Sequence, residues 1–173
     1  MCYQDDVTMK TIQLIRHAKS SWEHPNLSDH ERPLNERGMN DSQIMSQALF
    51  EAGVEFNQVY CSSANRAQLT IQNIAEYWQG RTINWQTSQD LYVFSGSAIW
   101  RFLQQLDDEW NHVTLLGHNP ALSDFINETQ AFRIDNLPTC AYVSLAFYTK
   151  QWCQIPEHHA NKLGFYKPKM FRP

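Results

Sequence analysis

The stretch "TIQLIRHAKSSW", Thr11–Trp22, decides how the rest of this sequence is interpreted. Its opening run, Thr11–Ile15, is short, apolar and contains β-branched residues, which is typical of a buried strand. Arg16 and His17 follow at the tip of that strand, and the chain then becomes small and polar. A guanidinium beside an imidazole is electrostatically unfavourable unless an anion lies between them. We therefore expect an anion-binding site at the end of this strand.

The composition indicates one globular domain. The chain has 173 residues, enough for one sizeable core and too few for two ordinary domains. Hydrophobic residues make up 42% and charged residues 18%, with no sign of disorder. We expect a short tail over residues 1–8 and a single domain over 9–173, because "MKTIQLIRH" from Met9 has the form of a natural start.

The net charge and the N-terminal residues indicate which binding partners and which cellular location to expect. The net charge of −4 argues against a broad nucleic-acid or anionic-membrane surface, although it permits a local basic pocket. No apolar run is long enough to span a membrane, and "MCYQDDVT" lacks the basic and apolar parts of a signal peptide. We therefore expect a cytoplasmic protein. Scattered cysteines without a CxxC pair predict reduced thiols and no structural zinc site; they are Cys2, Cys61, Cys140 and Cys153.

Strands and helices alternate along the chain. The expected helices cover residues 35–51, 62–78, 95–110 and 119–128, and the expected strands cover 11–15, 58–61, 81–85, 112–118, 139–148 and 151–155. Asn35 is expected to cap the first helix and Ser62 or Ser63 the second. The end of the chain, "KLGFYKPKMFRP", is expected to be irregular. This alternation predicts a three-layer α/β/α sandwich with a mostly parallel central sheet.

Unusual residues follow three of the expected strands, in "LIRHAKSS", "CSSANRAQLT" and "LLGHNPALS". Ligands of parallel α/β sheets gather at the carboxyl ends of the strands. The three junctions are therefore expected to bring one set of side chains to a common rim: Arg16, His17, Ser20, Ser62, Arg66 and His118.

These residue types suit a phosphoryl group. Two guanidinium groups supply planar forks for its oxygens, and the helix starts after Ser63 and Asn119 add N–H groups and positive dipole ends. A neutral imidazole in such a pocket is the natural nucleophile. The pattern therefore predicts an anion site built for phosphoryl transfer.

The four segments "LIRHAKSSW", "DHERPLNERG", "SSANRAQLT" and "LLGHNP", in this order, resemble the histidine phosphatase superfamily, also called phosphoglycerate mutase-like. The form "RHAKSSW…RPLNERG" is similar to the short branch of SixA-like phosphohistidine phosphatases. The resemblance extends from about Thr11 to about Phe147.

The resemblance implies a role for each matching residue. His17 matches the nucleophile that is transiently phosphorylated, and Arg16 and Arg66 match the arginines that clamp the phosphoryl oxygens. His118 matches the second histidine, which stabilises the transition state, and Ser20 lies near a further phosphate contact. The resemblance implies no metal and no cofactor, because arginine and imidazole neutralise the charge.

The acid that larger members use to protonate the leaving alcohol has no obvious counterpart. Asp90, in "SQDLYVFSGSA", is the candidate, although a lone loop carboxylate is more often solvated. Asp29 and Glu31, in "SDHERPL", either approach the pocket mouth, or hydrogen-bond within their own loop or pair with Arg32. A phosphohistidine substrate needs little acid help, because its P–N bond breaks readily once the imidazole is protonated.

Other residues are weaker candidates for a functional role. His158 and His159 lack a metal-binding partner set and are expected at the surface. Trp22 follows the pocket loop and is a candidate wall of the substrate entrance. The basic C-terminal segment is expected to be a packed or solvated tail that could guide an acidic partner.

The sequence thus predicts a metal-independent phosphatase with a covalent phosphohistidine intermediate, acting on a phosphorylated side chain of another protein. Short loops indicate an open pocket, which suits such a substrate better than a metabolite that needs enclosure. Two alternatives stay open: a small-molecule phosphomonoesterase of the same superfamily, and a non-catalytic module that binds phosphorylated groups.

Overall fold

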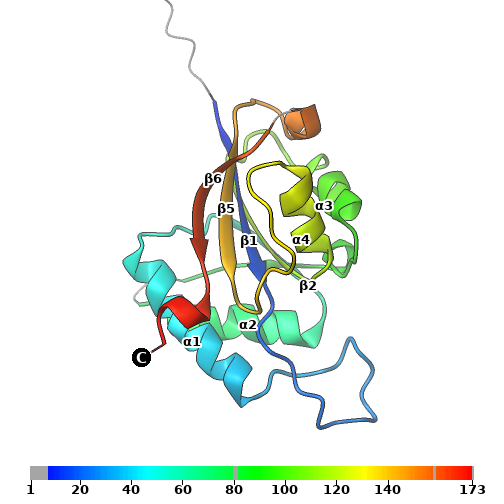
Figure 1. Cartoon of the computed structure of the whole chain (residues 1–173), viewed down its shortest axis with the longest axis vertical. Coiled ribbons are helices and arrows are strands. Elements are labelled where there is room, and N and C mark those ends of the chain that lie inside the picture. The colour runs from blue at the N-terminus through cyan, green and yellow to red at the C-terminus, as the bar shows by residue number, and fades with distance from the viewer. Residues whose placement is uncertain (1–7, 80–81, 158, 173) are drawn as a thin grey trace, which may run out of the picture.

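The computed structural model describes residues 8–79, 82–157 and 159–172; apart from Thr8, the expected tail over residues 1–8 lies outside them. Six strands form one sheet, and four α-helices pack against it (Figure 1). The strands are β1 (Lys10–Arg16), β2 (Gln58–Ser62), β3 (Gln86–Ser88), β4 (His112–Gly117), β5 (Tyr142–Phe147) and β6 (Asn161–Tyr166). The helices are α1 (Glu36–Glu51), α2 (Asn65–Glu76), α3 (Gly96–Leu103) and α4 (Ala121–Glu128).

The sheet has the strand order β3-β2-β4-β1-β5-β6. The pairs β2–β3, β2–β4 and β1–β4 are parallel, whereas β1–β5 and β5–β6 are antiparallel. The pair α1 and α2 covers one face of the sheet, and the pair α3 and α4 covers the other (Figure 1). This arrangement confirms the expected three-layer α/β/α sandwich with a mostly parallel sheet.

Successive side chains of β1 alternate between two hydrophobic clusters, one on each face of the sheet. Ile12 and Leu14 belong to the cluster that contains the apolar faces of α3 and α4. Ile15 belongs to the opposite cluster, with the buried residues of α1 and α2. Because successive side chains of a strand point to opposite faces, one strand supplies both layers. The end of β1 at Arg16, which His17 follows directly, is therefore held by packing on both faces of the sheet.

The start of α1 is as predicted, and the start of α2 is not. The Asn35 carboxamide accepts a hydrogen bond from the Gly38 N–H at 2.9 Å, which caps α1. The N-cap of α2 is Ala64, and no side chain caps that helix. The expected caps, Ser62 and Ser63, are used elsewhere: Ser62 is the last residue of β2 and contacts His118.

Three expected elements differ from those observed. The expected strand over 81–85 is displaced, because the strand that pairs with β2 is β3 at Gln86–Ser88; Arg81 lies outside the described residues. Helix α3 ends at Leu103 instead of continuing to residue 110. The segment 151–155, expected as a strand, lies in a 3-10 helix, Trp152–Glu157. In the 3-10 helix, the Trp152 side chain is fully buried and its Nε1 donates to the Trp110 oxygen at 2.9 Å.

The C-terminal segment is ordered, contrary to expectation. β6, Asn161–Tyr166, pairs with β5, and Arg172 forms an ion pair with Asp41 of α1. Phe165 and Tyr166 are half-buried, Phe165 against Phe132 and Tyr166 against Tyr142 of β5, which explains why a basic, mixed sequence nevertheless forms a strand. The tail is thus packed on one side, while Leu163, Met170 and Phe171 are exposed.

Gly38 lets the long loop after β1, residues 17–33, pack closely against α1. A Cβ added at Gly38 would meet the backbone oxygen of Lys19 at 2.2 Å, so no larger residue fits there. The Asn35 N–H also donates to the Lys19 oxygen, at 3.0 Å. Because Lys19 lies two residues after His17, this contact ties the start of the loop to the start of α1.

In the described part of the chain, every helix is too short or too polar to cross a bilayer. The cytoplasmic location stays a prediction.

Candidate active site

The carboxyl ends of three adjacent strands form the site. β1 lies between β4 and β5, and β4 lies between β1 and β2. The register pairs Arg16 with Gly117 and Cys61 with Leu116, so β1, β4 and β2 end at the same level. The residues that follow these ends are therefore neighbours, although they are far apart in the sequence. The predicted common rim exists and holds His17, Ser62, Arg66 and His118.

The backbone at His17 is held by neighbouring loops. Its N–H donates to the Gly117 oxygen at 3.0 Å, and its oxygen accepts from the Cys140 N–H at 3.2 Å. The next residue, Ala18, donates its N–H to the Thr70 hydroxyl at 2.9 Å. The His17 backbone is thus fixed by the end of β4 and by α2.

The protonation of the His17 ring follows from its two hydrogen bonds. Nε2 lies 3.3 Å from Nε of Arg66, and a guanidinium can only donate. Nε2 must therefore accept, which leaves the ring proton on Nδ1. Nδ1 lies 2.7 Å from the Ala18 oxygen and donates to it. This tautomer gives Nε2 a lone pair directed into the site, as a nucleophile requires.

His118 stands beside His17, with 5.0 Å between the ring centroids. Its Nε2 lies 2.7 Å from the hydroxyl oxygen of Ser62, which is fully buried. When Ser62 donates to Nε2, the imidazole proton sits on Nδ1. Nδ1 is buried and has no partner within the described residues. His118 therefore offers a free polar atom to a bound group.

Arg16 contributes a second guanidinium. Its Nη1 donates to the Asn136 side-chain oxygen at 3.0 Å and to the Leu137 oxygen. Its Nε is buried and unpartnered in the described part of the chain. Buried donors without a partner are rare in proteins. The free Nε of Arg16 and the free Nδ1 of His118 are therefore suited to hold an anion.

The environment keeps both imidazoles neutral. Burial lowers the pKa of His17 from its ordinary value of 6.5 to about 4, and the charge of Arg66 acts in the same direction; the hydrogen bond to Ala18 opposes it. Burial likewise lowers the pKa of His118 to about 3, reinforced by His17 and Arg66. At neutral pH the site therefore holds an uncharged His17 imidazole among fixed positive charges.

Residues 17–33 fold back over the guanidinium of Arg66. The Asp29 carboxylate lies 2.9 Å from Nη2 of Arg66 and 2.9 Å from Nη1 of Arg32. The Tyr92 hydroxyl donates to the same carboxylate at 2.7 Å. Asp29 thus pairs with Arg32, as one reading of the sequence had it, and also with Arg66, which no pattern in the sequence indicated.

Arg32 connects the loop to the remaining predicted contact, Ser20. The Ser20 hydroxyl accepts a hydrogen bond from Nη2 of Arg32 at 2.5 Å, and the Ser21 oxygen accepts from Nε at 3.1 Å. The Trp22 ring lies on the Arg32 guanidinium, 3.3 Å from its centroid to Cζ. Ser20 therefore reaches the site through Arg32, and its role as a phosphate contact stays a prediction.

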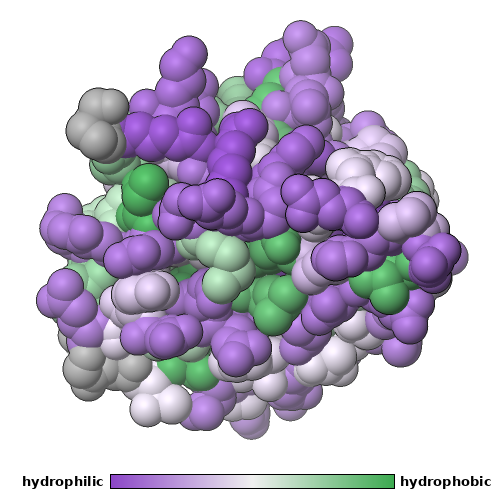
Figure 2. Space-filling view, turned by 90° about the horizontal axis from the view of Figure 1, so that it is seen from below, coloured by the Kyte–Doolittle hydropathy of each residue, from purple (hydrophilic) through white to green (hydrophobic). Residues whose placement is uncertain are grey.

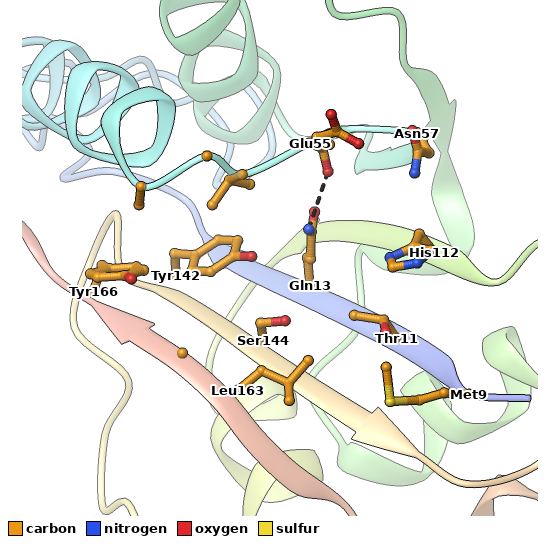
Figure 3. Close-up of a pocket in the computed structure, with 14 residues that line it drawn as sticks. Met9, Thr11, Gln13, Glu55, Asn57, His112, Tyr142, Ser144, Leu163 and Tyr166 are labelled. Carbon is orange, nitrogen blue, oxygen red and sulfur yellow. Dashed lines mark hydrogen bonds between the residues drawn. The ribbon is translucent and has the colours of Figure 1, made fainter. Parts of the chain in front are cut away.

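Figure 2 shows the end of the molecule toward which β1 runs, where hydrophilic side chains predominate and hydrophobic ones are scattered. A separate hollow of about 460 Å³ is lined by residues from the start of β1, from β5 and β6, and from the loop after α1. Figure 3 shows Thr11, Gln13 and Ser144 on its floor, with Gln13 bonded to the Glu55 backbone. None of the rim residues lines this hollow, so it is distinct from the site.

The comparisons with known proteins agree with this geometry. Residues 12–92 match the model of the histidine phosphatase superfamily (branch 1). That segment contains Arg16 and His17, at the end of β1, and Arg66, in α2 after β2. Over those residues, a little under half of its length, the chain is similar to the histidine phosphatase superfamily.

Two solved structures share the fold over almost the whole chain. A candidate phosphohistidine phosphatase SixA from Nakamurella multipartitia superposes with a TM-score of 0.77 at 19% identity, covering 92% of this chain and 96% of that one. The protein histidine phosphatase SixA complexed with tungstate gives 0.75 at 18% identity, covering 94% and 99%. At such identities the likeness shows the fold.

Curated sequence relatives match only in part. The 2,3-bisphosphoglycerate-dependent phosphoglycerate mutase of Bartonella henselae is 38% identical over 69 residues, which is 39% of this chain and 34% of the mutase. The match thus spans about a third of that relative's length. It supports the superfamily and leaves the activity of this chain open.

The role of Asp90 as an acid for the leaving group stays a prediction. Asp90 is exposed and lines a hollow of about 290 Å³ with Val93, Arg101 and Phe102 on the α3 side. The carboxylate that reaches the rim is Asp29. Its contact with Arg66, like that of Ser62 with His118, depends on how the long loop and the end of β2 fold, which residue spacing does not reveal.

Proposed function

We propose that this chain is a metal-independent phosphatase that forms a covalent phosphohistidine on His17 and acts on phosphohistidine carried by another protein. The observation that carries the proposal is the hydrogen bond from Nε of Arg66 to Nε2 of His17. It supports a neutral nucleophile that already faces a phosphate-binding guanidinium.

In the first step, the Nε2 lone pair of His17 attacks phosphorus, and the bond from phosphorus to the leaving group breaks. The leaving atom keeps the bonding electron pair. With phosphohistidine as substrate, a protonated leaving imidazole departs as a neutral ring, so the protein need not supply an acid. Arg66, Arg16 and His118 donate to the phosphoryl oxygens while charge builds on them.

In the second step, water attacks the phosphoryl group on His17, and the P–Nε2 bond breaks with its electron pair returning to Nε2. The Ala18 oxygen holds the Nδ1 proton throughout, at 2.7 Å in the free protein. The phosphorylated ring is therefore cationic, and a cationic ring is a good leaving group. The attacking water gives its proton to the phosphate product or to solvent.

The proposal needs no metal because fixed cations do the work that Mg²⁺ does in other phosphoryl-transfer sites. Arg16 and Arg66 supply full charges, and the His118 imidazole supplies a further donor. The donor set is also unsuited to a cation: in residues 8–79, 82–157 and 159–172, no three His, Cys, Asp or Glu side chains are placed to hold one.

The rim favours a substrate displayed on another protein. Trp22 is 74% exposed and Phe94 is 52% exposed. Phe94 packs against Tyr92 and His118, and Trp22 lies over Arg32, so exposed aromatic rings stand on two sides of the site. Aromatic side chains are common in protein interfaces. A macromolecular phosphohistidine can reach such a rim.

The test compares phosphate release from a phosphohistidine-bearing protein and from a small aryl phosphate, with a chelator present. The variant is His17→Ala, and the control is His112→Ala, an exposed histidine at the opposite end of β4. Fast, His17-dependent release from the protein with poor aryl turnover supports the proposal. Efficient aryl turnover with none on phosphohistidine moves the assignment to small phosphoesters. No turnover on either, with tight phosphate binding, favours a binding module.

A further inference from the structure

Asp29 is the centre of a charged network that adjoins the reactive imidazole. Its carboxylate accepts hydrogen bonds from Arg66, Arg32 and Tyr92. Its backbone oxygen accepts a further bond, from Nη1 of Arg66. Asp29 comes from the long loop after β1, Arg66 from α2 and Tyr92 from the segment after β3. The network therefore joins three parts of the chain beside His17.

The direction of the Arg66 guanidinium decides what this network does. A guanidinium has two edges that can each grip a partner: the Nη1/Nη2 edge and the Nε/Nη2 edge. Asp29 occupies the first edge, through its backbone oxygen and its carboxylate. Nε points to Nε2 of His17, so the second edge faces the imidazole. The second edge is thus left for a phosphoryl group on Nε2.

The rest of the network holds Asp29 in place. Arg32 bonds the other carboxylate oxygen, and Arg32 is itself buried, bonded to Ser20 and Ser21 and covered by Trp22. Partial burial acts to raise the pKa of Asp29, but the hydrogen bonds from Tyr92 and Arg66 outweigh it and lower the pKa to about 2. Asp29 is therefore a permanent carboxylate, which makes it an anchor for Arg66 and unsuitable as the acid for the leaving group.

We propose that Asp29 is a positioning residue: it grips the outer edge of Arg66 and so aims the inner edge at the phosphoryl group on His17. This inference rests on the phosphatase function proposed above. The opposing idea is that Asp29 occupies the place of the phosphate and must leave before substrate binds. The bonded edges argue against it, because Asp29 and His17 lie on different edges of the guanidinium.

A double-mutant cycle tests whether Asp29 acts through Arg66. We would measure kcat/KM of the wild type, Asp29→Asn, Arg66→Ala and the double variant on the phosphohistidine protein. Asp29→Asn alone is expected to lower kcat/KM about 10- to 100-fold, because charge-assisted hydrogen bonds orient the guanidinium. In the Arg66→Ala background, the same change is expected to alter kcat/KM less than about twofold. A carboxylate that merely supported the loop would have the same effect in both backgrounds.

Two further variants complete the experiment. Glu31→Gln is the matched control, because Glu31 is an exposed carboxylate of the same loop that bonds only to Ser28 through its side chain; its kcat/KM should stay at the wild-type value. Tyr92→Phe removes one bond to the Asp29 carboxylate and should lower kcat/KM about 2- to 5-fold, again only when Arg66 is present. It serves as the probe if Asp29→Asn does not fold, as circular dichroism would show.

An unchanged or raised kcat/KM in Asp29→Asn, or equal losses in both backgrounds, would overturn the positioning role. A wild type without turnover would remove the proposed function and this inference with it. A wild type with turnover whose variants are additive would remove the inference alone.

Discussion

Nε of Arg66 donates to Nε2 of His17 across 3.3 Å, and this contact defines the free state of the site. It shows which nitrogen of His17 holds the lone pair, and it places a guanidinium edge where a phosphoryl group would form. The contact is possible because β2 and β1 flank β4 and end at the same level. Predictions about the reaction follow from it.

Replacing Arg66 with lysine tests the need for a planar fork. Lysine keeps the charge but cannot present two parallel N–H groups, so we expect kcat/KM to fall about 100-fold in Arg66→Lys. Steady-state kinetics on the phosphohistidine protein measures the change. The control is Arg133→Lys, at an exposed arginine, which should keep wild-type kinetics. Similar activity in both variants would mean that charge alone suffices.

The lowered pKa of His17 predicts how the ring titrates. Because its folded-state pKa is about 4 and the ordinary value is 6.5, the ring should remain neutral with its proton on Nδ1 down to about pH 5. The stability that comes from burying the neutral ring is present above pH 6.5 and is lost as the pH falls through 4. Nuclear magnetic resonance of ¹⁵N-labelled histidine, assigned with His17→Ala, measures this directly. Titration of His17 near 6.5 would contradict the environment described.

Ser62 is expected to orient His118. Without its hydroxyl, Nε2 of His118 loses its 2.7 Å partner, and the proton no longer stays on Nδ1. We expect Ser62→Ala to lower kcat about 5- to 10-fold, the size of one hydrogen bond, with a smaller change in KM. Ser63→Ala is the matched control, because the Ser63 hydroxyl bonds to Gln89 and His30 instead. Equal kinetics in the two variants would exclude an orienting role for Ser62.

Gly38 is expected to be sensitive for a steric reason. In Gly38→Ala, the added Cβ would lie 2.2 Å from the Lys19 oxygen, so α1 or the loop must shift. Forcing extra volume into a packed site costs about 1–3 kcal/mol, which lowers the melting temperature by several degrees. Differential scanning calorimetry would record the change. Gly164→Ala is the comparison, because its Cβ meets only side-chain atoms, of Tyr166 at 3.5 Å and of Tyr142 at 3.9 Å. Equal melting temperatures would show that the loop moves freely.

The sequence was sufficient to predict which side chains meet at the carboxyl ends of the strands. Arg16, His17, Arg66 and His118 follow strands whose apolar runs are easily recognised, and parallel strands bring their ends together. Burial of a strand strongly restricts the register in which it can pair. The positions of the residues at its end can therefore be predicted.

The support for these residues could not be predicted in the same way. Asp29 lies in a loop without periodicity, and its choice of Arg66 as a partner depends on the path of residues 17–33. Asp90, in contrast, had a suitable position in the sequence but lines a different hollow. The C-terminal strand β6 was missed because it lies at the edge of the sheet with its first half exposed, and it lacks the apolar alternation of a half-buried strand.

The central claim is that His17 carries the phosphoryl group during turnover. The most direct measurement is rapid acid-free quenching of a reaction with ³²P-labelled phosphohistidine protein, followed by mass spectrometry of the trapped enzyme at neutral to alkaline pH. We expect the label on Nε2 of His17, with none in His17→Ala and none on His118. Label on another residue, or full turnover by His17→Ala, would contradict the account.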